Sequence, residues 1–292
     1  MSNPKLIEQL LHHTPDQGFN ETTIPQLRLY RRIHPTTEPM PAIYEPSICV
    51  IIQGSKRLLM GDRAVTYDPW NYLVNALTLP LHAEMPEASP DKPFLGFLIR
   101  FDPVDVGTLL AEIDNQVQWP LDPPPQAISP CPLDEALAHT MNRLVGCLDD
   151  TLDRRILASG LIREILYRVL RGPKGWILRE QALRGGKANQ VARAVAYLEE
   201  NFRENLDVES IARQAAMSPS ALHQHFKQMT ALSPMQYVQR LRLHQARALL
   251  LSGRAAAEAG FEVGYNSPSQ FSREFRRLFG VPPSRVKEAP AP

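Results

Sequence analysis

The chain has 292 residues, of which 43% are hydrophobic and 22% charged; this composition is typical of a globular protein with two domains and excludes a disordered chain. No apolar run approaches the roughly 20 residues that a membrane-spanning helix needs, and residues 1–5 do not begin a signal peptide, so we expect a cytoplasmic protein with no membrane partner. The net charge of +1 combines a basic C-terminal third, with 15 Lys and Arg against 9 Asp and Glu in residues 183–288, and an acidic remainder, which favours a phosphate-contacting module on an acidic body.

Short apolar stretches separated by turn-forming residues occupy the region from about residue 22 to residue 101. Frequent turns between short strands predict an antiparallel sandwich or a small β-barrel. The clearest strands are expected at residues 48–52, 57–60, 64–67, 72–74 and 94–99, with turns at Gly54, Gly61-Asp62, Asp68-Pro69 and Pro90-Asp91.

Helical patterns begin after this region. Asp102-Pro103 predicts a short helix with an aspartate cap and proline in its first turn. A proline-dense, extended connector follows at residues 119–125, and helices are expected near residues 133–148 and 152–170. This helical pair either packs on the strand domain or forms a dimerisation hairpin, and both can be true. Residues 184–187 then predict a flexible linker.

The C-terminal third carries clear helix start and stop signals. A first helix is expected near residues 189–201, and a long fourth helix near residues 234–252 should measure about 28 Å at 1.5 Å per residue. The signals are an Asp207 cap, Ser218-Pro219 at the start of the third helix, a capping box of Ser233 and Gln236, Gly253 after the fourth helix, and a second capping box of Ser267 and Gln270.

Two stretches of this region, residues 208–227 and 256–276, repeat one helix-turn-helix pattern with a shift of about 48 residues. Ser218-Pro219-Ser220 aligns with Ser267-Pro268-Ser269 in the second copy. Leu222 and Phe226 of the first copy align with Phe271 and Phe275 of the second. A repeat at this period indicates a duplicated unit, and this unit is one that inserts a helix into a DNA groove. We call the two copies the first unit and the second unit.

Each unit predicts a recognition helix that is anchored by its large apolar residues and reads DNA with its opposite face. Donor and acceptor side chains on that face are suited to base edges and to phosphates, and an arginine can pair with both acceptors of a guanine. Base contacts are predicted for Ser220, His223, Gln224, Ser269, Gln270, Ser272 and Arg273, and phosphate contacts for Lys227, Arg276 and Arg277.

Residues 189–286 resemble the AraC/XylS family of bacterial transcription regulators. The likeness rests on Gly264-Tyr265, on residues 267–275 and on residues 279–283, in the family's order and spacing. The sequence departs from the family pattern at Gly260, where alanine is usual, and at Ala216 and Ala231, where the first unit usually has glycine.

The front half resembles the N-terminal domain of one branch of this family, on residues 43–47, 53–57, 67–69 and 79–80. The resemblance implies an α+β protein: an N-terminal cupin-like β-barrel or sandwich with accessory helices, then an all-α domain with two helix-turn-helix motifs joined by a long helix. The expected divisions are a cupin-like effector-binding domain at 1–116, a Pro-rich connector and helical hairpin at 117–182, a linker at 183–188 and a DNA-binding domain at 189–288.

The front domain offers little catalytic or metal chemistry to the sequence. His82 and Glu84 share one face of a predicted strand, but no companion ligand pair is evident, so we expect no metal site. Cys49 lies in an apolar strand and is interpreted as a core residue, with a thiol sensor beside Lys56 and Arg57 as the alternative. Cys131 and Cys147 are too widely spaced for a disulfide scaffold or a C-x-x-C site.

Taken together, the residues and the resemblance predict a regulator that binds promoter DNA and a small effector, forms a homodimer, and contacts RNA polymerase if it is an activator. No catalytic residue and no cofactor are expected, and the effector-binding residues are unknown. Two alternatives stay open: a metal-dependent cupin enzyme with a regulatory tail, and an architectural DNA-binding protein without effector control.

Overall fold

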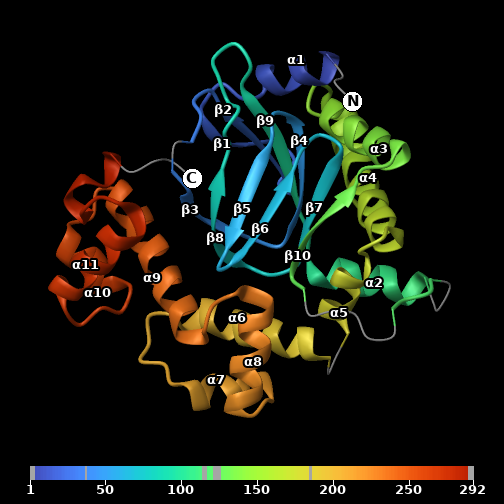
Figure 1. The fold of residues 1–292 in the computed structure, drawn as a ribbon. Helices are drawn as coiled ribbons and strands as arrows, with labels where there is room; N and C mark the ends of the chain where they lie inside the picture. The colour runs from blue at the N-terminus through green and yellow to red at the C-terminus, as the bar shows by residue number, and fades with distance from the viewer. Residues whose placement is uncertain (1–3, 37, 114–116, 121–125, 184–185, 289–292) are drawn as a thin grey trace.

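The computed structural model describes residues 4–36, 38–113, 117–120, 126–183 and 186–288 (Figure 1). The predicted connector at 119–125 lies largely outside the described residues, as do residues 184–185 of the predicted linker. The linker prediction is wrong at Lys187, which begins a helix. No helix in the described parts of the chain combines the length and apolar character that a bilayer crossing requires.

Strands of the front region form two antiparallel sheets, as the short apolar stretches and frequent turns predict. The larger sheet has the order β1 (Gly18–Glu21), β2 (Leu27–Arg32), β9 (Phe94–Arg100), β4 (Ser47–Gln53), β7 (Asn71–Asn75) and β10 (Ile128–Pro132). The smaller sheet has the order β3 (Met40–Tyr44), β8 (Leu79–Glu84), β5 (Lys56–Met60) and β6 (Arg63–Tyr67).

The central strand β4 explains how the two faces of the larger sheet are used. Cys49 and Ile51 point into the core between the sheets, whereas Ile48 and Val50 join a second core on the outer face. Because both faces are covered, this strand is apolar at every interior position instead of alternating.

Helices cover that outer face. Leu6 and Leu10 of the first helix and Ile165 and Leu166 of the long hairpin helix belong to this outer core. The helices are α1 (Pro4–His12), α2 (Pro103–Ile113), α3 (Glu135–Gly146), α4 (Thr151–Arg171) and α5 (Trp176–Ala182). The predictions of α2, α3 and α4 are confirmed, and Asp102, Asp134 and Asp150 accept backbone hydrogen bonds at the starts of these helices.

The C-terminal region is helical and follows the predicted start signals. Its elements are α6 (Lys187–Asn201), α7 (Val208–Ala215), α8 (Pro219–Thr230), α9 (Pro234–Leu251), α10 (Ala256–Glu262), α11 (Pro268–Phe279) and the 3-10 helix η1 (Pro283–Glu288). Ser233 and Gln236 form the reciprocal capping box at the start of α9. The second predicted box is only half formed, because Ser267 accepts from the Gln270 backbone while the Gln270 side chain donates to Glu274 at 3.1 Å.

A left-handed residue follows both the first helix and the recognition helix of each unit. Ala216 and Ala231 of the first unit have φ values of 52° and 59°, where the second unit has Gly264 and Gly280. In this conformation the β-carbon of alanine lies too close to the following carbonyl oxygen, and glycine, which has no β-carbon, avoids this strain. The alanines that depart from the family pattern are therefore strained positions.

The glycine at position 260, in α10, is explained by close helix packing and not by a left-handed conformation. A β-carbon there would lie 2.9 Å from Cδ1 of Phe271, so the absence of a side chain lets α10 and α11 approach each other closely.

The helical region packs directly against the smaller sheet (Figure 1). The Tyr237 hydroxyl on α9 donates to the carbonyl oxygen of Thr78 at 2.8 Å, and both groups are buried. Arg63, at the turn between β5 and β6, donates to the Gln228 carbonyl near the end of α8 at 3.1 Å. One continuous apolar core includes the inner faces of both sheets and the interior of the helical region.

Replacing Ala216 with glycine should relieve the strain in the first unit. We expect Ala216→Gly to raise the free energy of unfolding by about 0.5–1 kcal/mol in denaturant titrations. The matched control is Ala221→Gly inside α8, which has helical geometry and should lower stability by about 1 kcal/mol. Equal destabilisation by the two substitutions would contradict the assignment of strain.

Candidate functional site

Helices α8 and α11 each present a polar face to solvent because their apolar residues lock the other face into the core. Leu222 and Phe226 of α8 are fully buried, and Phe271 and Phe275 of α11 are at most 1% exposed. In α11 the rings of Phe271, Phe275 and Phe279 contact one another in sequence at centroid distances of 5.6 and 4.6 Å. This anchoring gives each exposed face a defined orientation.

The predicted contact residues all lie on these exposed faces. They are Ser220, His223, Gln224 and Lys227 on α8, and Ser269, Gln270, Ser272, Arg273, Arg276 and Arg277 on α11. Exposure is what a groove contact requires, and the individual base and phosphate contacts stay predictions.

Two of these side chains lie on the side of α11 that faces α9 and have neighbours there. Gln270 donates to Glu274, and Arg277 lines a cavity together with residues of α9 and β8. Ser272, Arg273 and Arg276 are exposed without such engagement and form the more open part of the α11 face.

The two units are held at a fixed separation by Arg242 in the middle of α9. Its guanidinium donates to the carbonyls of Phe202 and Glu204, before α7, at 2.6 and 2.7 Å, and to that of Gly264, between α10 and α11, at 3.1 Å. Gly264 itself lies so close to Arg203 that a β-carbon would stand 2.5 Å from the Arg203 carbonyl oxygen. The geometry therefore connects the loop before the first unit directly to the turn of the second.

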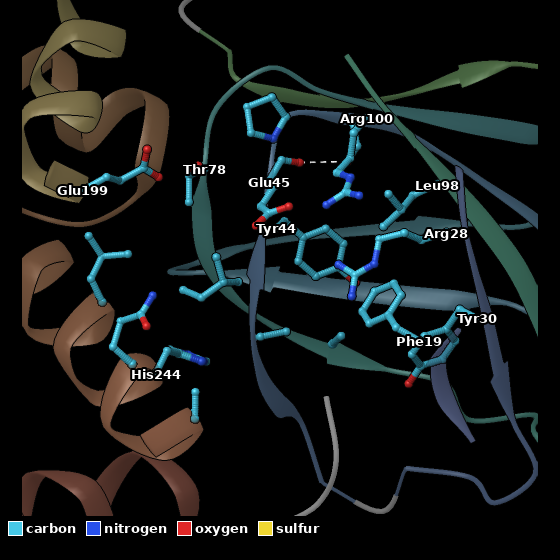
Figure 2. A pocket seen from close by; sticks show the side chains of 18 of the residues that line it. Phe19, Arg28, Tyr30, Tyr44, Glu45, Thr78, Leu98, Arg100, Glu199 and His244 are labelled. Atoms are coloured by element: carbon cyan, nitrogen blue, oxygen red, sulfur yellow. Dashed lines mark hydrogen bonds between the residues drawn. The ribbon is translucent and has the colours of Figure 1, made fainter. Parts of the chain in front are cut away.

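A cavity of about 680 Å³ lies between the barrel and the helical region, within the size range of small-molecule sites (Figure 2). Figure 2 shows Phe19, Arg28 and Tyr30 on the barrel side, and Glu199 and His244 on the helices opposite. Apolar side chains from both regions complete the wall, among them Ile43, Met85, Leu98, Phe202 and Leu241.

Lys56, which sequence reasoning considered only as a neighbour of the Cys49 thiol, lines this cavity. Its side chain is 8% exposed, and its ammonium lies 5.2, 5.0 and 5.8 Å from the ring centroids of Tyr30, Tyr44 and Phe94. Among the described residues it forms no ion pair. Burial lowers the pKa of Lys56 to about 8, so the ammonium still carries most of its charge at neutral pH. In the sequence, Lys56 directly precedes the strand predicted at residues 57–60.

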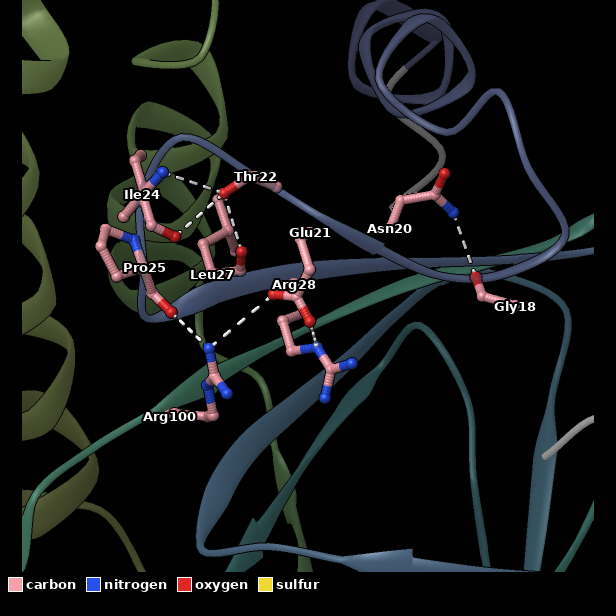
Figure 3. A network of polar contacts seen from close by, with 9 residues as sticks. All are labelled: Gly18, Asn20, Glu21, Thr22, Ile24, Pro25, Leu27, Arg28 and Arg100. Carbon is pink, nitrogen blue, oxygen red and sulfur yellow. Dashed lines mark hydrogen bonds and ion pairs between the residues drawn. The ribbon is translucent and has the colours of Figure 1, made fainter. Parts of the chain in front are cut away.

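The other two cations of the cavity are compensated at its rim (Figure 3). Arg28 pairs with Glu21 at 2.7 Å, and Arg100 lies 3.8 Å from the same carboxylate and donates to the Pro25 carbonyl at 2.6 Å. Lys56 is thus the cation of this cavity that lacks an acid.

Acidic groups lie toward the helical side of the cavity. Burial and the neighbouring Glu45 carboxylate raise the pKa of Glu199 on α6. Burial, with Arg247, Arg240 and His82 nearby, lowers the pKa of His244 on α9 to about 3, so its imidazole is neutral at physiological pH. The electrostatics therefore favour an anionic group at Lys56 over one at α6.

The other candidate residues of the barrel are Cys49, His82 and Glu84. Cys49 is 7% exposed and burial raises its pKa, which fits the core interpretation and disfavours a reactive thiolate. His82 and Glu84 do share a strand face; His82 accepts from Arg240 at 3.4 Å and Glu84 pairs with Arg57. The described residues hold no group of three metal-ligating side chains.

Comparisons with known proteins match both regions. Residues 23–177, more than half of the chain, match the family profile described as AraC-type transcriptional regulator N-terminus, and residues 211–289 match a helix-turn-helix domain. The HTH-type transcriptional activator RhaS of Salmonella schwarzengrund is 32% identical over 163 residues, which are 53% of this chain and 56% of that protein. RhaS of Salmonella paratyphi A is 31% identical over 160 residues, with the same coverage. The chain thus spans little more than half the length of these curated relatives.

Solved structures show the same two-domain fold. ToxT from Vibrio cholerae superimposes with a TM-score of 0.61 and 11% identity, over 91% of this chain and 99% of ToxT. A structure of ToxT with a bound unsaturated fatty acid gives a TM-score of 0.58 and 12% identity, over 90% and 95% of the two chains.

The burial of Lys56 predicts a pH-dependent stability effect. Because the folded-state pKa, about 8, is below the ordinary value of 10.5, burying the charge costs stability below pH 8, and this cost disappears as the pH rises toward 10.5. Lys56→Met should raise the free energy of unfolding by up to about 3 kcal/mol at pH 7 and by about half of that or less at pH 9.5. Denaturant titrations at both pH values measure the effect.

The control is Lys92→Met, which removes an exposed lysine from a loop and should change stability little at either pH. A loss of stability in Lys56→Met that is the same at both pH values would contradict the burial of an unpaired charge.

Proposed function

The chain belongs to the AraC-type family of transcriptional regulators, and from this membership we propose that it is a sequence-specific DNA-binding regulator of bacterial promoters that responds to a small effector. The observation that carries the proposal is the pair of anchored recognition helices, α8 and α11, with polar faces open to solvent. We assign it no catalytic residue and no cofactor. A regulator of promoters acts where the chromosome is, so we place the protein in the cytoplasm.

In the proposed binding mode, α8 and α11 enter consecutive major grooves on one face of the duplex. Helix α9 has 18 residues and is about 27 Å long, close to the roughly 34 Å repeat of B-DNA once the flanking turns are added. Arg242 supports this mode because it ties both units to one helix. One chain can then read an asymmetric site, without a palindrome.

Two substitutions separate base reading from phosphate contact. Arg273→Ala should cost about 1–3 kcal/mol of affinity for the cognate site and relax specificity at one base pair. Lys227→Ala should weaken binding to all sequences alike and reduce the slope of log affinity against log salt by about 1. Titration of cognate and scrambled duplexes at several salt concentrations makes the comparison, and equal losses on both duplexes for Arg273→Ala would remove the base-reading assignment.

For the effector we propose an apolar molecule with a carboxylate, bound in the cavity between the barrel and the helices with its carboxylate at Lys56. The support is a buried ammonium without an acidic partner, set in a mainly apolar cavity. ToxT, which shares the fold, has been solved with an unsaturated fatty acid and with a naphthalenyl butenoic acid, both of which are carboxylic acids.

The cavity connects the effector to DNA binding because both regions line it. Thr78 lines the cavity and accepts the Tyr237 hydrogen bond, and the Tyr237 ring packs edge-on against Phe226 of α8 at 5.4 Å. A ligand that binds one arrangement of barrel and α9 more tightly than another shifts the population of that arrangement.

Ligand titrations test the effector class. The fatty acid oleate should bind to the full chain about tenfold or more tightly than oleyl alcohol, which has the same chain without the charge. Lys56→Met should remove this preference, and Lys92→Met should keep it. Equal affinity of the wild type for the two ligands would contradict the role of the carboxylate, and binding of neither would contradict the ligand class.

We further propose that two copies associate through α4. Leu152 and Ile156 are 65% and 66% exposed, and Tyr167 continues their face of the helix. Gly160 between them has open space beside it, which lets a second helix approach closely. Sedimentation equilibrium should show a wild-type dimer that Ile156→Glu dissociates, whereas Val104→Glu, at an equally exposed position on α2, should leave it intact. A monomeric wild type would contradict this interface.

The named function of the curated relatives suggests activation, so we propose RNA polymerase as the partner at the promoter. In this scheme the barrel with helices α1–α5 senses the effector and pairs the subunits, and helices α6–α11 bind DNA.

A further inference from the structure

A second cavity, of about 350 Å³, lies where β8, α9 and α11 meet. It shares no lining residue with the effector cavity. Its wall consists of His82, Leu232, Gln236, Gln239, Arg240, Leu243, Glu274, Arg277 and Leu278.

Three basic side chains reach this cavity from three separate elements: His82 from β8, Arg240 from α9 and Arg277 from α11. Arg240 Nη1 donates to His82 Nδ1 at 3.4 Å, a pairing in which neither partner supplies negative charge. Within the described part of the chain, neither arginine lies within ion-pair distance of a carboxylate. Arg240 is half-buried, so solvent screens its charge only partly.

The cavity wall also holds one carboxylate. Glu274 accepts from the Tyr265 hydroxyl at 2.7 Å and from Gln270 at 3.1 Å. Although burial opposes it, these hydrogen bonds and the nearby charge of Arg277 lower the pKa of Glu274, so this carboxylate compensates part of the charge of Arg277. The positive groups lie close enough to affect one another: burial and Arg277 lower the pKa of Arg240, and burial and Arg240 lower that of His82. An oxyanion in the cavity would oppose both effects.

We propose that this cavity binds the phosphate group of a small molecule, with Arg240, Arg277 and His82 as its donors. A phosphate has oxygens on all sides and accepts donors that converge from three elements, whereas a carboxylate accepts in one plane. Leu232, Leu243 and Leu278 leave an apolar wall for the organic part of the ligand. Bound phosphate would tie α11, which carries the second recognition surface, to strand β8 of the barrel.

The site faces the barrel and not the open DNA-reading face of α11, where Arg273 and Arg276 lie. This placement favours a small phosphorylated ligand over the phosphate backbone of DNA, and it makes Arg276 a matched control for Arg277 on the same helix.

Calorimetric titration of the full chain with inorganic phosphate and with glycerol 3-phosphate, without DNA, tests the proposal. One phosphate per chain should bind saturably and raise the thermal midpoint. Arg240→Gln and Arg277→Gln should each weaken binding about tenfold or more, whereas Arg276→Gln should bind as the wild type does. Arg277 is exposed, so its variant keeps the test valid if Arg240→Gln fails to fold.

Absence of saturable binding would overturn the proposal. So would equal weakening by Arg276→Gln, since that result indicates diffuse surface charge. Loss of duplex affinity in Arg277→Gln together with no phosphate binding by the wild type would assign the cluster to DNA instead.

Discussion

The hydrogen bonds from Arg242 to three backbone carbonyls are the constraint on which the arrangement of the C-terminal region depends. A guanidinium has five donors in a rigid plane, so one side chain can satisfy carbonyls from two loops and fix their relative position. One loop precedes the first unit and the other lies within the second unit, and α9, which carries Arg242, spans the distance between the two units. The hydrogen bonds of Arg242 also bring Gly264 close to Arg203. Any side chain at position 264 would therefore displace the loop before the first unit.

The same helix joins the DNA-reading region to the barrel. Tyr237 is fully buried, one turn from the start of α9, and contacts both the barrel backbone at Thr78 and the recognition helix at Phe226. Movement of the barrel relative to α9 must therefore break or remake a buried hydrogen bond, which gives the two arrangements discrete energies. In the proposed scheme, the effector occupies the cavity beside Thr78 and acts on this junction.

Much of the fold was predictable because its signals are local. Aspartate and serine caps marked the starts of α2, α7, α8, α9 and α11, and the apolar pattern located the strands β4, β5, β6, β7 and β9. Strand β10 was missed because its sequence contains Pro130 and Pro132, which are tolerated at the edge of a sheet but do not indicate a strand. Helices α1 and α5 are short, with 9 and 7 residues, and take their stability from packing.

The functional surfaces also divide into those with local sequence signals and those without. The exposed residues of α8 and α11 followed from a repeated motif, whose spacing places them opposite the buried anchors. The cavities could not be predicted, because Lys56, Arg240 and Arg277 line them together with residues that are distant in the sequence. Even within one helix, the contact of a single side chain was not predictable. Gln270 has the position of a capping residue, but its side chain donates to the Glu274 carboxylate one turn later.

We propose that one chain places two recognition helices, whose spacing α9 determines, in successive turns of a duplex. Hydroxyl-radical footprinting of the full chain on a bound promoter measures this directly. The predicted result is two protected patches on one face of the DNA, centred about 10–10.5 base pairs apart. Protection confined to a single helical turn, or two patches on opposite faces, would contradict it.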